Sequence, residues 1–215
     1  MKSTVRDVMT TDVAAVDQQV SFHAVAELLI EKGVSAVPVL DDDGHVVGVV
    51  SETDLLAKEE FKGCYYGDDY RPPLRSRIRH SAGSEGNRHR KSLGETAGEL
   101  MTSPAHVTLP DASIVTAARH MDRQGVKRLP VVDANGRLIG IVSRHDLIKV
   151  FLRSDQHLLA LVKEAVRADE LGISVTVSGG AVTFRGAFPE RSQPSMALHL
   201  AGSVDGVVSV RHCIP

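Results

Sequence analysis

Apolar positions along residues 5–57 alternate between helical and strand spacing. After a short extended piece, a first helix is predicted by the spacing of Val25, Ala26, Leu28 and Leu29. Gly33 follows where a helix end favours a residue that can adopt positive φ. Apolar residues 37–40 and 46–50 predict two strands, joined by a hairpin turn at Asp-Asp-Asp-Gly, and a second helix comes next. The pattern therefore predicts a β-α-β-β-α unit.

The same pattern returns in the second half of the chain. Met9 matches Met101, a step of 92 positions (101 − 9 = 92), and Val37-Pro38-Val39-Leu40-Asp41 matches Leu129-Pro130-Val131-Val132-Asp133 at the same step. Gly48 to Leu55 matches Gly140 to Leu147 likewise, without a gap. One shared offset over so many pairs indicates a tandem repeat. Such short units bury little surface alone, so we expect the copies to pack against each other.

These motifs resemble the CBS domain. The resemblance rests on Met-Thr, the helix ending in Gly-Val, Pro-Val-x-Asp, and the run Gly, two apolar residues, Ser-x-x-Asp-Leu, and it covers residues 5–57 and 97–152. Tandem pairs of this domain form the Bateman module. The resemblance implies an α/β (α+β) fold in which two β-α-β-β-α repeats pack as a pseudo-symmetric pair. It also implies a regulatory protein that binds an adenine nucleotide, such as AMP, ADP or ATP, between the repeats.

Candidate chemistry lies at Ser51-x-x-Asp54 and Ser143-x-x-Asp146, each between a strand and a helix. Each is compatible with a capping box, in which the Ser and the acid satisfy backbone N–H groups. A helix N-terminus can also bind phosphate, and an Asp one turn on can accept ribose hydroxyls. The CBS resemblance implies that Asp54 and Asp146 contact ribose and that Ser51 and Ser143 contact phosphate. The presence of both motifs favours nucleotide binding.

The two copies differ in charge around this motif. The second has Lys127, Arg128, Arg144 and His145, where the first has Ser35, Ala36, Glu52 and Thr53. We interpret Lys127, Arg128 and Arg144 as phosphate ligands, with surface solubility as the alternative. The second site is therefore predicted to tolerate phosphate charge better.

Residues 58–96 interrupt the repeats. Positive charge concentrates in 71–91, with Glu85 as the acid among Arg, Lys, Pro, Ser and Gly, and all three tyrosines lie just before it. Such composition predicts a mobile linker. Basic residues beside aromatics could alternatively follow a nucleic-acid backbone, so a nucleic-acid-binding regulator acting through 71–91 is the second functional hypothesis.

Residues 155–215 read as a separate small α+β domain. An amphipathic helix is predicted over 155–171, strands over 173–177 and 182–186, a helix over 190–201, and a last strand over 205–210. Gly180-x-Val182-x-Phe184-x-Gly186 and the late Gly206-Val207 resemble the BON domain. That family is associated with membrane or partner contact, so we expect an unknown protein partner here.

Composition narrows the functional class. No catalytic set emerges among the ten histidines and the acids, so an enzyme is not expected, nor is a metal or a cofactor beyond the regulatory nucleotide. Two unrelated cysteines, no signal-like N-terminus and no long apolar run predict a cytoplasmic protein. A net charge of −2 favours neither nucleic acid nor membrane as partner. The resemblance to tandem CBS pairs implies a homodimer.

Overall fold

The computed structural model describes residues 3–60, 91–186 and 194–213. The chain forms two compact units. The first unit contains residues 10–110 and 129–141, and the second contains 1–9, 111–128 and 142–215. The second repeat is thus divided, with its strands mostly in the first unit and its helices α7 and α8 in the second.

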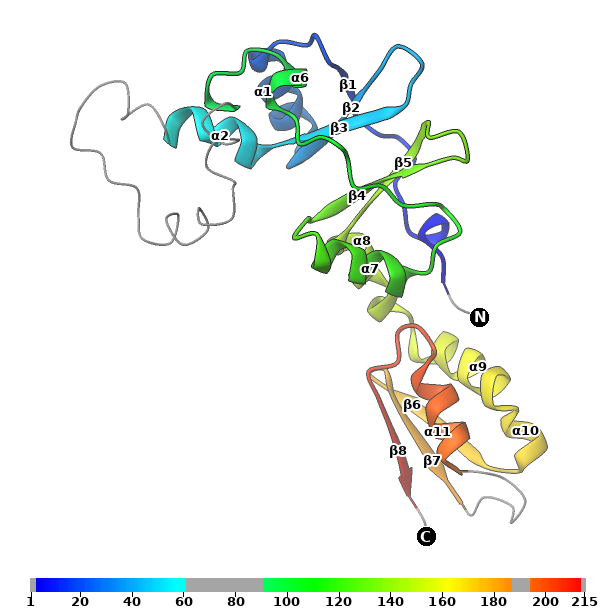
Figure 1. Cartoon of the computed structure of the whole chain (residues 1–215). Coiled ribbons are helices and arrows are strands. Elements are labelled where there is room, and N and C mark those ends of the chain that lie inside the picture. Colours follow the sequence, from blue (N-terminus) through cyan, green and yellow to red (C-terminus); the bar gives the residue numbers. More distant parts are fainter. Residues whose placement is uncertain (1–2, 61–90, 187–193, 214–215) are drawn as a thin grey trace. The chain divides into compact units, whose positions relative to one another are not determined.

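The first repeat has the predicted order of elements: β1 (Val16–Asp17), α1 (Phe22–Lys32), β2 (Ala36–Leu40), β3 (Val46–Ser51) and α2 (Glu52–Glu60) (Figure 1). β1 runs parallel to β2, and β2 runs antiparallel to β3. Ser21 caps α1 by accepting a hydrogen bond from the N–H of Ala24, and Gly33 ends it at φ 60°. The predicted positive φ of Gly33 is confirmed.

Small aliphatic side chains fill the core of the first unit. The buried cluster comprises Val16, Val25, Leu29, Val37, Val39, Val50, Ala97 and Leu100. Strand residues on one face of the sheet meet the helix positions spaced by four, which is why the apolar pattern changes period between elements. Ala97 and Leu100 belong to α6 (Ala97–Leu100), which leads into the second repeat.

The second repeat follows the same plan with α7 (Ile114–Arg123), β4 (Arg128–Val132), β5 (Leu138–Ser143) and α8 (Arg144–Ile148), then the 3-10 helix η3 (Lys149–Leu152). A single parallel bridge between Thr108 and Val131 stands where the first repeat has β1 beside β2. Both positions lie 92 after their counterparts Val16 and Val39 (108 − 16 = 131 − 39 = 92). The predicted α/β (α+β) fold of two repeats is confirmed.

The C-terminal domain lies in the second unit and consists of α9 (Asp155–Val166), α10 (Ala168–Leu171), β6 (Ser174–Ser178), β7 (Ala181–Arg185), α11 (Pro194–Gly202) and β8 (Ser209–Cys213). Its sheet has the order β6-β7-β8, antiparallel and then parallel. Phe184 is fully buried at the centre of its core, with Val162, Val182 and Ala201.

Two predicted boundaries in this domain were wrong. The helix expected over 155–171 is interrupted at Arg167, whose φ of 52° ends α9 before α10 begins. The last strand begins at Ser209 rather than at 205, because Gly206 takes φ 100° and turns the chain first. Within the described ranges, no helix is long and apolar enough to cross a bilayer.

Candidate functional site

The Ser51–Asp54 motif sits where β3 ends and α2 begins. Asp54 Oδ2 accepts a hydrogen bond from the backbone N–H of Ser51 at 2.8 Å and another from the Ser51 hydroxyl at 2.7 Å. One carboxylate oxygen is thereby fixed against the strand end. The other oxygen, Oδ1, remains as the acceptor that a ligand could use.

The second repeat reproduces this geometry. Asp146 Oδ2 accepts from the Ser143 N–H at 2.9 Å and from the Ser143 hydroxyl at 2.6 Å. The Ser143 Oγ in turn accepts from the Asp146 N–H at 3.3 Å, which makes the motif a capping box. The capping box predicted from the sequence is therefore formed at Ser143 and Asp146. It orients the Asp146 carboxylate through Oδ2 and does not involve Oδ1.

In each repeat a lysine occupies that second oxygen. Lys91 Nζ donates to Asp54 Oδ1 at 2.6 Å and to Thr102 Oγ1 at 2.7 Å. Lys149 Nζ donates to Asp146 Oδ1 at 2.8 Å. The two lysines differ in burial, since the Lys91 side chain is 6% exposed whereas the Lys149 side chain is 53% exposed.

Asp146 is held in its ionised form. Burial acts to raise its pKa, but hydrogen bonds from Lys149 and Ser143 together outweigh that effect, and the pKa falls below the ordinary value of 3.8. An ionised carboxylate is purely an acceptor of hydrogen bonds. It is thus suited to a ligand that brings hydroxyl donors, such as the diol of a ribose.

The predicted phosphate ligands of the second repeat lie near one another. The Arg144 N–H donates to the carbonyl of Lys127 at 3.0 Å, so the start of α8 adjoins the segment before β4. The side chains of Lys127 and Arg144 are exposed, and Arg128 is partly buried. In the first repeat the matching bond joins Glu52 to Ser35 at 3.1 Å.

The structure adds a cation to the first site that the comparison of the two repeats did not identify. Lys91, assigned from sequence to the solvated linker, is buried and paired with Asp54. Comparison of the repeats could not find it, because its counterpart would fall before residue 1 (91 − 92 = −1). The first repeat also has no lysine equivalent to Lys149, because the matching position 57 is a buried Ala. The remainder of the basic segment, residues 71–90, lies outside the described residues, as does the nucleic-acid hypothesis built on it.

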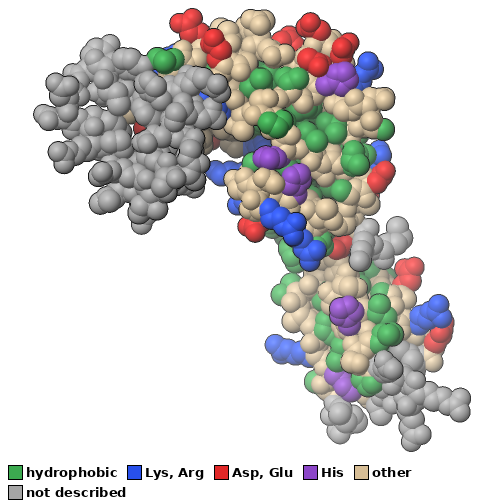
Figure 2. Space-filling model, in the orientation of Figure 1, with side chains coloured by type: hydrophobic (Ala, Val, Ile, Leu, Met, Phe, Trp, Pro, Cys, Tyr) green, Lys and Arg blue, Asp and Glu red, His purple; other side chains and the backbone are tan. Residues whose placement is uncertain are grey.

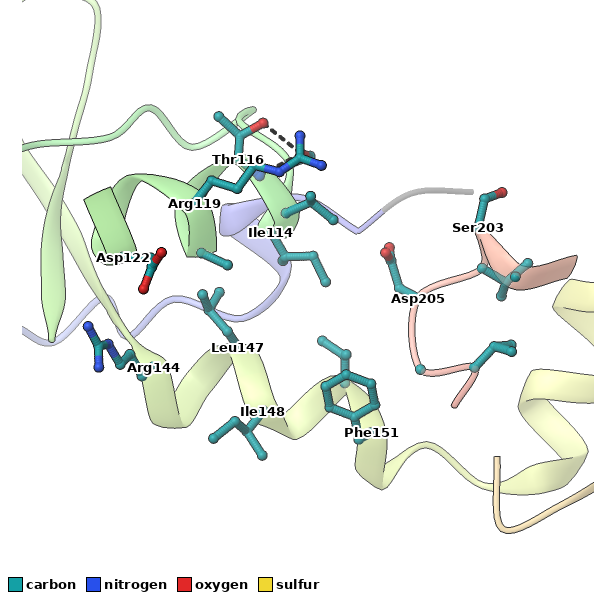
Figure 3. A pocket seen from close by; sticks show the side chains of 18 residues that line it. Ile114, Thr116, Arg119, Asp122, Arg144, Leu147, Ile148, Phe151, Ser203 and Asp205 are labelled. Atoms are coloured by element: carbon teal, nitrogen blue, oxygen red, sulfur yellow. Dashed lines mark hydrogen bonds between the residues drawn. The ribbon is translucent and has the colours of Figure 1, made fainter. Parts of the chain in front are cut away.

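The second unit also contains a pocket of about 890 Å³ (Figure 3). Its walls are largely apolar and come from α7, α8, η3 and the loop 202–207, with Ile114, Leu147 and Phe151 pointing inward in Figure 3. Arg144 lines it, but neither Ser143 nor Asp146 belongs to the described lining residues. The pocket is therefore distinct from the Ser–Asp motif.

Comparison with known proteins agrees with this architecture. The CBS domain family matches residues 5–60 and 97–153, and the BON domain family matches residues 154–213. The CBS domain-containing protein CBSX2, chloroplastic, of Arabidopsis thaliana is 35% identical over 152 residues, which are 70% of this chain and 64% of that protein. CBSX1, chloroplastic, of the same plant is 30% identical over the same shares of the two chains. The chain thus spans less than two thirds of these relatives.

Solved structures give the same result. CBSX2 in complex with AMP aligns with a TM-score of 0.56 at 34% identity, over 69% of this chain and 96% of that chain. The CBS domain pair of protein MJ0100, in complex with 5′-methylthioadenosine and S-adenosyl-L-methionine, aligns at 20% identity and a TM-score of 0.51, a likeness of fold. That alignment covers 70% of this chain and 97% of the pair. The chain belongs to the CBS domain family, as a tandem CBS pair followed by a BON domain.

Proposed function

We propose that the chain is a non-enzymatic regulator that senses an adenine nucleotide, such as AMP, ADP or ATP, through its CBS pair. The observation that carries the proposal is the doubled Ser–Asp motif, in which the serine fixes one oxygen of each acid and a single lysine contacts the other. A relative at 34% identity that was solved with AMP supports the same ligand class.

In this proposal Asp54 and Asp146 accept the two ribose hydroxyls. Ser51 and Ser143 mark strand ends at which helix N–H groups face a phosphate, and anions are favoured there by the helix dipole. Lys127, Arg128 and Arg144 would add charge-assisted contacts to the phosphate in the second repeat. The adenine base has no assigned residue.

The ligand would act by favouring one arrangement of the module over another, since a ligand shifts an equilibrium only by its differential affinity. A homodimer is part of the proposal. Leu56 on α2 and Ile148 on α8, which are equivalent positions (148 − 56 = 92), are 63% and 58% exposed. Figure 2 shows hydrophobic side chains exposed at the surface among polar and charged ones. The BON domain would contact a protein partner.

A thermal-unfolding screen tests the ligand class. AMP, ADP, ATP, NAD and S-adenosylmethionine are compared with uridine monophosphate, which offers the same ribose and phosphate on another base. A ligand at a hundred times its Kd stabilises the native state by about 2.7 kcal/mol. We expect a concentration-dependent rise in Tm with at least one adenine nucleotide. If every adenosine compound behaves like uridine monophosphate, the proposed function is wrong.

A further inference from the structure

The two candidate ribose carboxylates are blocked by lysines of different kinds. Lys149 is on the helix that carries Asp146, three residues further on, and more than half of its side chain is in solvent. Lys91 comes from 37 residues beyond Asp54 and is buried. The two lysines therefore differ in sequence position and in burial, although each donates to the equivalent oxygen, Oδ1, of its own aspartate.

The free energy needed to move each lysine away from its aspartate differs between the two sites. The exposed ammonium of Lys149 can exchange its partner for water, although Asp146 itself is buried. A buried ammonium has no such exchange, and Lys91 would lose both Asp54 and Thr102 on moving. Breaking a buried pair while both charges stay inside is strongly unfavourable.

The occupied oxygen is the one that a ribose needs. Asp54 Oδ2 already accepts two hydrogen bonds from Ser51, so a diol that bridges the carboxylate must reach Oδ1. Lys91 Nζ stands 2.6 Å from that oxygen. Three of the roughly four acceptor positions of the Asp54 carboxylate are then used, whereas a diol that donates two hydrogen bonds needs two of them. The lysine and the ribose therefore compete for an acceptor position on Oδ1.

Building on the proposed function, we propose that Lys91 determines the selectivity between the two sites by acting as an internal competitor at Asp54. The ligand then binds at the Asp146 site at lower concentration, because Lys149 moves into solvent with a smaller loss of free energy than Lys91. The Asp54 site fills only when the ligand displaces Lys91. This reverses the role expected of a cation near a nucleotide, since Lys91 here lowers affinity rather than raising it.

Calorimetry in single-site backgrounds tests the competition. Asp146→Ala leaves the first site, and its affinity for adenosine and for AMP is measured with Lys91 and with Lys91→Met. A hydrogen bond to a charged group contributes about 1.5–3 kcal/mol, so Lys91→Met should raise the affinity for both ligands about tenfold or more. The matched control is Lys149→Met in the Asp54→Ala background, where a smaller rise is expected.

The two ligands separate competition from phosphate contact. If Lys91 instead bound phosphate, Lys91→Met would weaken AMP and leave adenosine unaffected, and the inference would be overturned. Unchanged affinity for both would overturn it too. Thr102→Val removes one of the two lysine contacts with little change of shape, and we expect an intermediate gain; this variant keeps the charge pair should Lys91→Met fold poorly.

Failure of the proposed function gives a different result. If neither the parent chain nor Lys91→Met binds any adenosine compound, both claims fall. If the parent chain binds AMP but Lys91→Met does not raise the affinity of the Asp146→Ala chain, the proposed competition is wrong and the proposed function stands. Binding that appears only after Lys91→Met supports it. Thermal unfolding of every variant establishes that the compared chains are folded.

Discussion

Thr102 and Val49 exchange two backbone hydrogen bonds, with Thr102 N donating at 2.9 Å and Val49 N at 3.1 Å. Thr10 and Ile141 make the equivalent exchange at 2.9 and 2.8 Å. The segment that leads into each repeat thus pairs with a strand of the other repeat. The short units are completed in this way, which gives a physical reason for the tandem arrangement.

The N-terminal segment around Val5, which contacts the second repeat, should contribute measurably to the free energy of unfolding. Val5, in η1 (Val5–Asp7), is fully buried, and its N–H donates to the carbonyl of Ala112 before α7 at 2.8 Å. We expect Val5→Ala to lower the free energy of unfolding by about 2 kcal/mol, through lost burial and the cavity left behind. Urea unfolding measures this. Val115→Ala, at a 44% exposed position on α7, should cost much less; equal losses would contradict the packing assigned to Val5.

The recurring Gly in the second strand has a packing reason in the first repeat. A Cβ added at Gly48 would collide with the Sδ of Met101 and would lie 2.8 Å from its Cγ, closer than real side chains approach. Gly48→Ala should therefore destabilise the fold by about 1–3 kcal/mol.

A double-mutant cycle identifies the cause of that loss. Met101→Ala removes the Sδ and Cγ that the new methyl would meet and keeps only the Cβ, so Gly48→Ala should cost less in that background than alone. Denaturant unfolding of the four proteins gives the coupling energy. Additive losses would show that Met101 is not what excludes a side chain at position 48.

The C-terminal domain should carry a pH-dependent contact at Asp155. Its carboxylate accepts hydrogen bonds from the N–H groups of Gly180 and Gly179, which lower its pKa below the ordinary value of 3.8. A depressed folded-state pKa means stability that is present above the unfolded pKa and lost as the pH falls through the folded pKa.

Thermal unfolding of Asp155→Ala checks this contact. The variant should have a lower Tm than the parent chain at pH 7, and the gap should narrow as the pH falls below the ordinary carboxyl range. Asp122→Ala, at an exposed Asp of α7, serves as the control and should show no such narrowing. A gap at Asp155 that stays constant with pH would mean that the ionised carboxylate is not what stabilises the turn.

The fold of the CBS pair was predictable because it repeats. A single offset of 92 aligned strand, turn and cap residues, and local chemistry then placed elements such as the helix that Gly33 ends. The C-terminal domain was less predictable at its boundaries. Arg167 adopts positive φ although it is not a glycine, so the residue type at this position did not predict the end of α9.

The candidate site was predictable only in its local part. Ser143 and Asp146 are three apart, so their capping-box relation could be predicted from the sequence. Lys91 reaches Asp54 from 37 positions away, and burying a lysine runs against its usual exposure. Only the folded chain brings it there, because a buried ammonium depends on a partner that sequence spacing does not reveal.

Calorimetric titration of AMP into the parent chain and into the Asp54→Ala, Asp146→Ala double variant tests the central claim most directly. The single variants, each retaining one acid, are the controls for the individual sites. The account predicts saturable AMP binding by the parent chain, and no detectable binding by the folded double variant, since both ribose acceptors are gone. Stoichiometric binding of AMP that survives in the folded double variant would contradict it.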